Sequence, residues 1–148
     1  MEKEDDWRQH KTVIVEEGEW KAKIDERLAP LIRAIWKAGI ETTMCCQEFH
    51  RGIAWIAFAS ADDLTAFLNL VGIYESGDDT LYNRINYRNG AISAPLWEYF
   101  VNVGDLQENN GYHGPPDFNI TIGLFFPVCD IPALLKRLTD IAATGQEE

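Results

Sequence analysis

The sequence lacks the long apolar segments that would place it in a membrane or a secretory pathway. Its longest uninterrupted apolar run, Ile53 to Ala59, is far shorter than the about 20 residues that a membrane-spanning helix needs. The chain begins with Met-Glu-Lys-Glu-Asp-Asp, which is not the pattern of a secretory signal peptide. We therefore expect a soluble, cytoplasmic protein that does not associate with membranes.

Cysteine is scarce as well, with three residues, Cys45, Cys46 and Cys129. An odd number of cysteines without a secretory signal does not indicate a disulfide framework. Adjacent side chains in a strand point to opposite faces, so Cys45 and Cys46 are badly placed to bridge each other. We expect all three to be reduced thiols.

Basic residues are outnumbered: 13 Lys and Arg face 24 Asp and Glu, for a formal net charge of −11. The imbalance is strongest between Ser60 and Asp130, where two basic residues face ten acidic ones. Nucleic-acid binding normally needs a basic surface, so this charge argues against a nucleic-acid partner. The acidic excess by itself indicates solubility rather than a particular function.

Common catalytic motifs are also missing. The sequence contains no glycine-rich phosphate loop, no His-Glu-x-x-His motif and no Ser-His-Asp order, so it gives no support to P-loop enzymes, zincins or common hydrolases. What it does contain is an ordinary globular composition, 46% hydrophobic and 25% charged. In a chain of this length, that composition is enough for one core.

Three helices are expected from apolar spacing and capping residues. The first has apolar residues from Ile24 to Trp36 at helical spacing; Pro30 either begins its regular part or kinks it, and Gly39 ends it in the left-handed conformation. Ser60 and Asp63 have the spacing of a capping box, which begins a second helix. Asp130 caps the third, with Pro132 in its first turn.

Strands are expected between these helices, whereas Gly18–Lys23 shows no clear pattern and Gln47–Gly52 is expected to be a turn. The expected strands are Thr12–Glu16, Glu41–Cys46, Ile53–Ser60, Leu81–Arg88, Pro95–Val103 and Phe118–Phe126, the last two forming a hairpin across a long loop. This order predicts an α+β fold: a ferredoxin-like two-layer sandwich with helices on one face of a largely antiparallel sheet. We expect a flexible acidic leader at 1–11, one domain at 12–143 and a tail at 144–148.

One stretch also resembles a known group of proteins. The matching residues are Leu28-Ala29-Pro30-Leu31-Ile32, Ile35-Trp36, Gly39-Ile40, Thr42, Cys46-Gln47 and the apolar segment 54–58. Their layout resembles a family of small uncharacterised bacterial and phage-like proteins with the pattern APLI…LW…GI.T..SCQ. This chain departs from the pattern at Cys45, where the family has serine, and at Glu48, where glycine is expected. The resemblance implies an α+β fold and no reaction.

The densest group of reactive side chains is Cys45-Cys46-Gln47-Glu48-Phe49-His50. A thiolate beside a histidine can act as a nucleophile, and thiols with a histidine can hold a metal. If the strands that precede Cys46 and Cys129 run parallel, both thiols lie at one end of the sheet. Cys46, His50 and Cys129 are therefore candidate metal ligands, and the alternative is that these cysteines are ordinary core and surface residues.

Two other groups are weaker candidates. Tyr82, Arg84 and Arg88 would share one face of a strand, where the guanidinium groups suit an anionic ligand or simply pair with nearby carboxylates. His113 lies in a long polar loop and is a candidate acid or base, or a merely solvated residue. His10 lies in the charged leader, and we assign it no role.

Five tryptophans are many for 148 residues. Trp36 and Trp55 fit the core, whereas Trp7 and Trp20 are expected to dock onto the domain or onto a partner. We therefore predict a small binding or interaction domain without catalysis, which forms a homodimer or binds another protein. One alternative is a thiol- or metal-dependent enzyme that uses Cys45 or Cys46 with His50 and Cys129. The other is a binder of small anions or nucleotides through Arg84 and Arg88.

Overall fold

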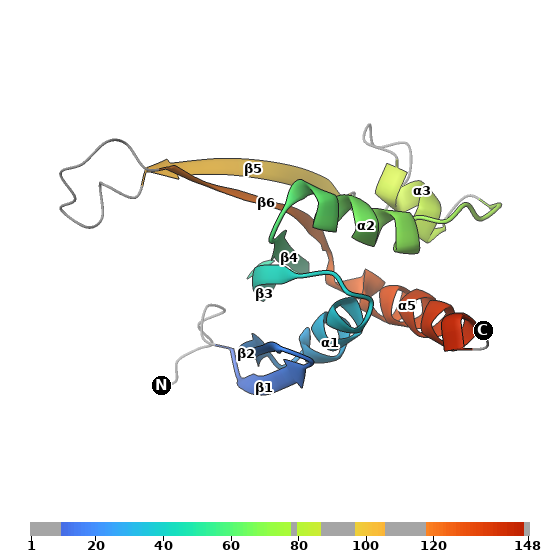
Figure 1. Ribbon diagram of the computed structural model, residues 1–148. Coiled ribbons are helices and arrows are strands. Elements are labelled where there is room, and N and C mark those ends of the chain that lie inside the picture. Colours follow the sequence, from blue (N-terminus) through green and yellow to red (C-terminus); the bar gives the residue numbers. More distant parts are fainter. Residues whose placement is uncertain (1–9, 78–79, 87–96, 106–117, 147–148) are drawn as a thin grey trace, which may run out of the picture.

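The computed structural model describes residues 10–77, 80–86, 97–105 and 118–146, without the side chains of residues 49, 50, 105, 118 and 143–146. Six strands in two antiparallel sheets and four α-helices lie in these ranges (Figure 1). Within the same residues, no helix is long and apolar enough to cross a bilayer. The mixed α+β class predicted from the sequence is confirmed.

The first sheet is a hairpin of β1 (Thr12–Glu17) and β2 (Trp20–Asp25). Gly18 makes the turn with a φ of 62°, which glycine adopts without strain. Strand β2 has no two-residue alternation of apolar side chains, because only Ile24 is buried in it, and the sequence pattern therefore does not reveal the strand. Ile24 belongs to this strand and not to the first helix, where its spacing had placed it. Val15 and Ile24 join the core, next to α1.

Helix α1 (Ala29–Lys37) follows directly. Pro30 lies in its first turn, where the missing N–H group is not needed, so the helix is not kinked there. Gly39, with a φ of 84°, stands just after the helix, as predicted. The helix buries Leu31, Ile32 and Ile35.

The second sheet consists of two hairpins joined side by side (Figure 1). Its strands lie in the order β3 (Thr42–His50), β4 (Ile53–Phe58), β6 (Phe118–Pro127) and β5 (Glu98–Asp105). The predicted pairing of the last two strands is confirmed, and their register ends with Asp105 opposite Phe118. The order of the described elements, ββαββααββα, is not the βαββαβ order of a ferredoxin-like fold, so that finer prediction is not confirmed.

The predicted turn at Gln47–Gly52 is wrong, because β3 continues to His50. The register shifts between Cys46 and His50, so the strand passes through a bulge. Polar partners hold this bulged segment: the Gln47 N–H donates to Asp25 and the Gly52 N–H donates to Glu48. The actual turn lies at Gly52, whose φ is 79°.

One face of the second sheet forms the core with the helices. Ile56, Leu124 and Phe126 are fully buried on it, together with Phe67 of α2 (Ala61–Val71) and Leu134 of α5 (Ile131–Gln146). Helix α2 begins as predicted: the Ser60 hydroxyl accepts the Asp63 N–H at 3.1 Å. A short 3₁₀ turn, Val128–Asp130, leads from β6 into α5.

The predicted strand at Leu81–Arg88 is wrong, because residues Leu81–Asn86 form helix α3. Leu81 and Ile85 are both buried, and their four-residue spacing suits a helix as well as a strand. The Thr80 hydroxyl accepts the Asn83 N–H at the start of the helix. This local cap favours the helix over the strand.

Candidate functional site

The two adjacent cysteines lie on opposite faces of β3, as expected for a strand. Cys45 stands opposite Ile56 and packs against the core, whereas Cys46 stands opposite Trp55. Burial, followed by the negative charge of Asp25, raises the pKa of the Cys45 thiol to about 12. Cys45 is therefore a neutral, buried thiol near neutral pH.

Cys46 is half-buried and lies beside two residues from the first hairpin. The ligand atoms of His10, Asp25 and Cys46 all lie within 4.8 Å of one another. Burial raises the pKa of the Cys46 thiol, and the carboxylates of Asp25 and Glu48 raise it further. A nucleophilic cysteine needs a lowered pKa, so these surroundings do not suit thiol catalysis.

Asp25 is held in place by the contact between β2 and β3. Its Oδ2 atom accepts the Gln47 N–H at 2.9 Å, and the Gln47 side chain accepts the Arg27 N–H at 2.7 Å. These two hydrogen bonds tie the end of β2 to the bulged part of β3. As a result, the carboxylate of Asp25 lies next to Cys46.

His10 reaches the same place from the segment just before β1. Asp25 pairs with Thr12 across the two strands, and the Glu26 N–H donates to the Lys11 carbonyl at 2.8 Å, which continues the pairing towards His10. The Nε2 atom of His10 is buried and has no hydrogen-bond partner in the described part of the chain. The sequence alone does not single out His10, because the hairpin that brings it to Asp25 includes β2, which has no clear sequence pattern.

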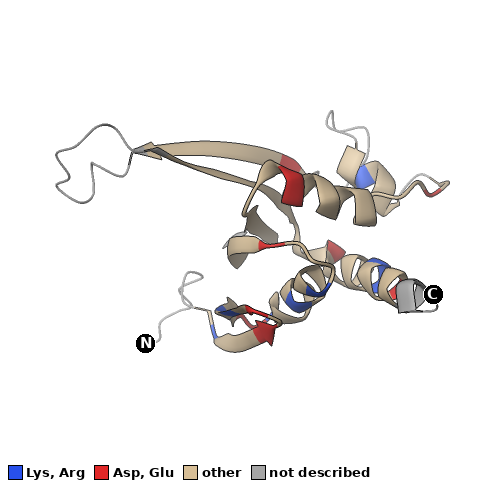
Figure 2. Ribbon diagram, in the orientation of Figure 1, with Lys and Arg blue, Asp and Glu red and all other residues tan. Residues whose placement is uncertain are grey.

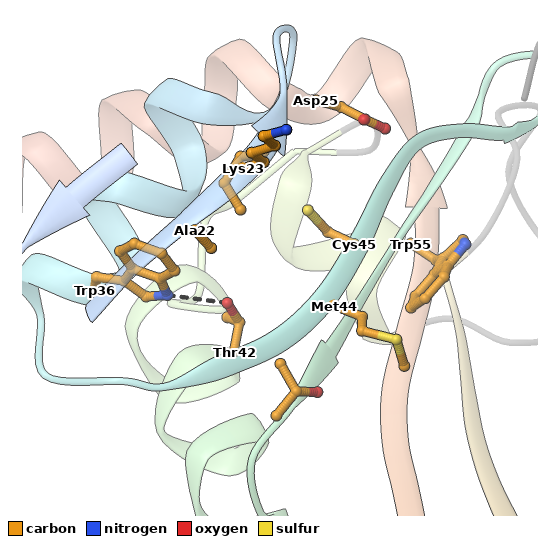
Figure 3. A pocket seen from close by; sticks show the side chains of 10 residues that line it. Ala22, Lys23, Asp25, Trp36, Thr42, Met44, Cys45 and Trp55 are labelled. Atoms are coloured by element: carbon orange, nitrogen blue, oxygen red, sulfur yellow. Dashed lines mark hydrogen bonds between the residues drawn. The ribbon is translucent and has the colours of Figure 1, made fainter. Parts of the chain in front are cut away.

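A pocket of about 270 Å³ lies between β2 and β3, with Asp25 at one end (Figure 3). At the other end, the indole N–H of Trp36 donates to the Thr42 hydroxyl at 2.9 Å. Figure 3 shows the Cys45 side chain directed towards β2. The pocket shares Asp25 with the cluster of His10, Asp25 and Cys46.

The other predicted members of the thiol cluster are not brought together by the described residues. Strands β3 and β6 do run parallel, because each is antiparallel to β4. Cys129 is nevertheless exposed in the 3₁₀ turn after β6 and does not belong to the group of His10, Asp25 and Cys46. The side chain of His50 and all of His113 lie outside the described residues, so their roles stay predictions.

The predicted anion-binding residues do not share a strand face. Arg84 lies on α3 and is largely buried; its guanidinium binds Asp130 through Nε at 2.9 Å and through NH2 at 2.7 Å. The indole of Trp97 donates to the second oxygen of Asp130 at 2.9 Å. The ring of Tyr82 packs against Tyr74, and Arg88 lies outside the described residues. Anion binding by these residues stays a prediction.

The burial and packing of the described tryptophans agree only in part with the prediction. Trp36 is buried as predicted, but Trp55 is half-buried, on the sheet face away from Ile56. The ring of Trp20 packs edge-on against Trp36 with centroids 6.1 Å apart, so Trp20 docks onto the domain itself. Trp7 lies outside the described residues.

An apolar surface occurs instead on the hairpin of β5 and β6, which projects past the helices (Figure 1). Val101, Val103 and Ile120 are 61%, 65% and 67% exposed. The register places Val103 opposite Ile120 and Val101 opposite Ile122, so these side chains share one face of the hairpin. We call Val101, Val103 and Ile120 the arm strip.

Comparison with known proteins gives one informative relative. The chain is similar to "Uncharacterized protein R428" of Acanthamoeba polyphaga mimivirus, with 28% identity over 122 residues, or 79% of this chain. The match spans 61% of that viral protein's length. No family model and no solved structure matches the chain. The relative is itself uncharacterised, and the resemblance to a bacterial and phage-like family is not confirmed.

Proposed function

We propose that this chain is an interaction domain that pairs with a second copy of itself through the arm strip. The observation that carries the proposal is the contiguous apolar face formed by Val101, Val103 and Ile120. Single exposed apolar residues are ordinary on protein surfaces, but contiguous exposed apolar residues mark interaction sites. No catalytic step is needed for this function.

The strip continues the core face of the sheet beyond the helices. Tyr99 and Leu124 are paired on this face, and Leu124 is fully buried. Two residues further along β5, Val101 is mostly exposed, and Figure 1 shows that the outer part of the hairpin extends beyond α2. The apolar pattern of the strands therefore extends further than the helices that cover it.

The distribution of charge favours a second copy of the chain as the partner that packs on the arm strip. Two chains with a net charge of −11 each repel one another over most of their surfaces. The part of the hairpin between Glu98 and Asp105, the two ends of β5, is the exception: residues 99–104 and 119–127 contain no charged side chain, and Figure 2 shows this part of the ribbon without acidic or basic residues. Two arm strips can therefore pack face to face about a two-fold axis without bringing like charges together.

The test is the molar mass in solution, measured by light scattering over a range of protein concentrations. We expect twice the 16.8 kDa of the single chain for the wild type, and 16.8 kDa for Val103→Asp and Ile120→Asp. Both side chains are about two-thirds exposed, so these variants should fold, which circular dichroism checks. Ile14→Asp is the matched control, because Ile14 is an exposed apolar residue in β1, away from the arm.

Each outcome decides for or against the proposal. Loss of the dimer in both arm variants, with the dimer kept in Ile14→Asp, supports it. A wild type that stays monomeric at every concentration overturns it, as does a dimer that survives both arm substitutions. Equal dissociation of Ile14→Asp overturns it too, because the arm strip would then not be the specific interface.

A further inference from the structure

We propose that His10, Asp25 and Cys46 form a binding site for a divalent metal ion of the zinc class. The three residues come from segments far apart in the sequence: the residue range before β1, the end of β2 and the middle of β3. Their ligand atoms nevertheless lie within 4.8 Å of one another. This site is separate from the arm strip and does not depend on the function proposed for it.

The donor set selects the kind of metal. A thiolate and an imidazole are ligands that zinc prefers, whereas magnesium and calcium prefer oxygen ligands alone. With bonds of about 2.0–2.3 Å, ligand atoms around a tetrahedral zinc lie about 3.5 Å apart. A contraction of about 1 Å from the metal-free separation completes this geometry. Deprotonated Asp25 and Cys46 also supply two negative charges, which balance the charge of a divalent ion.

The second, independent observation is the state of His10. Its Nε2 atom is buried and lacks a hydrogen-bond partner within the described residues. Buried polar atoms in native proteins are nearly always paired, because leaving one unpaired is unfavourable. A metal ion bound through Nε2 would supply the missing partner. Binding would also remove the proton from Cys46, since the thiolate is the form that ligates.

Neighbouring backbone groups orient the other two ligands. The Gln47 N–H donates to Asp25 at 2.9 Å and fixes the carboxylate beside the site. The backbone of Glu48 offsets part of the rise in the pKa of the Cys46 thiol that burial causes. Such supporting hydrogen bonds are typical of metal sites. Three protein ligands leave a fourth position open, as in sites where zinc binds water or a ligand.

The position of the site gives the metal a structural consequence. His10 and Asp25 belong to the open end of the first hairpin, whereas Cys46 belongs to the second sheet. A shared ion would therefore clamp the hairpin to β3, next to the hydrogen bond between Gln47 and Asp25. This effect gives a thermal-stability readout that requires no enzymatic activity.

The experiment uses the full chain, purified without chelator and then stripped and titrated with Zn²⁺ and Co²⁺. We expect one ion per chain, a cobalt–thiolate charge-transfer band and a higher melting temperature on binding. His10→Gln and Cys46→Ser should each weaken zinc binding by at least about 10-fold. Cys129→Ser is the matched control, because it removes an exposed thiol that lies outside the cluster.

Three results would overturn the proposal. The first is that the wild type binds no stoichiometric zinc. The second is that Cys129→Ser weakens binding as much as Cys46→Ser. The third is that His10→Gln binds normally while His50→Gln does not, which would assign the imidazole ligand to His50, as the sequence analysis predicted. Val103→Asp should bind zinc like the wild type, so failure of this proposal and failure of the proposed dimer are distinguishable.

Discussion

Two carboxylates each join distant parts of this chain, but their surroundings differ. Asp130 is buried, and both of its oxygens are used: Oδ1 by Arg84 and Oδ2 by Trp97. Asp25 is half-buried and accepts a hydrogen bond from Gln47, yet it lies beside a buried His10 nitrogen that has no partner among the described residues. One cluster is complete with the chain's own groups, whereas the other includes a histidine with an unpaired, buried ring nitrogen among the described residues.

This difference separates two roles that look alike in a sequence. A buried polar cluster in which every hydrogen bond is formed needs only a structural role, because it stabilises the fold by itself. A cluster that leaves a buried nitrogen unpaired is explained better by a ligand that completes it.

Replacing Asp130 with Ala should lower the free energy of unfolding by about 3–5 kcal/mol, because it leaves the buried Arg84 guanidinium without its carboxylate. The Trp97 N–H loses its acceptor as well. Urea denaturation followed by circular dichroism measures the change. Asp140→Ala is the control, since its ion pair with Lys136 is exposed and should be worth less than about 1 kcal/mol. Equal losses in the two variants would mean that the Asp130 network is not structural.

Zinc should stabilise the wild type by about 2.7 kcal/mol at a free concentration 100 times its dissociation constant. The reason is that the folded chain brings His10, Asp25 and Cys46 together and the unfolded chain does not. Denaturation with zinc, and again with a chelator, measures the difference. Cys46→Ser should show little of this stabilisation. The same zinc effect in Cys46→Ser and wild type would argue for binding elsewhere.

In the absence of metal, Asp25→Ala should lower the free energy of unfolding by only about 1 kcal/mol, because it removes the hydrogen bond that the Gln47 N–H donates. The loss should therefore be clearly smaller than that of Asp130→Ala under the same conditions. Chelator-treated protein and urea denaturation provide the comparison. If the two losses match, Asp25 is mainly structural, and the contrast between the two carboxylates disappears.

Val103→Asp should change the free energy of unfolding of the single chain by less than about 0.5 kcal/mol, because this side chain is 65% exposed. Denaturation at a concentration where the protein is monomeric separates this value from the effect of dimerisation. A loss of more than about 2 kcal/mol would show that the arm strip supports the fold of the chain itself.

The sequence predicted well those elements that depend on neighbouring residues. Ser60 and Asp63 begin α2 through a hydrogen bond three residues apart, and Gly39 ends the first helical segment through its own backbone conformation. A local pattern gave the wrong element where it fits two kinds of structure. The spacing of Leu81 and Ile85 suits both a helix and a strand, and the structure has a helix there.

The polar clusters could not be predicted in the same way. Arg84 and Asp130 are 46 residues apart, and no local pattern pairs them. His10 lies near Asp25 because the first hairpin brings the two residues together. It lies near Cys46 because the first hairpin packs against β3 of the second sheet. The sequence analysis did single out Cys46, because cysteine chemistry is recognisable by residue type alone. Its partners depend on tertiary contacts between segments that have no common motif.

The most direct test of this distinction is a crystal structure of protein grown with zinc, with anomalous diffraction recorded on both sides of the zinc absorption edge. We predict an anomalous peak about 2.0–2.3 Å from the His10 nitrogen, an Asp25 oxygen and the Cys46 sulfur. No such peak should lie next to Asp130. An empty cluster in zinc-soaked crystals, with His10 bonded to another protein group, would contradict the account.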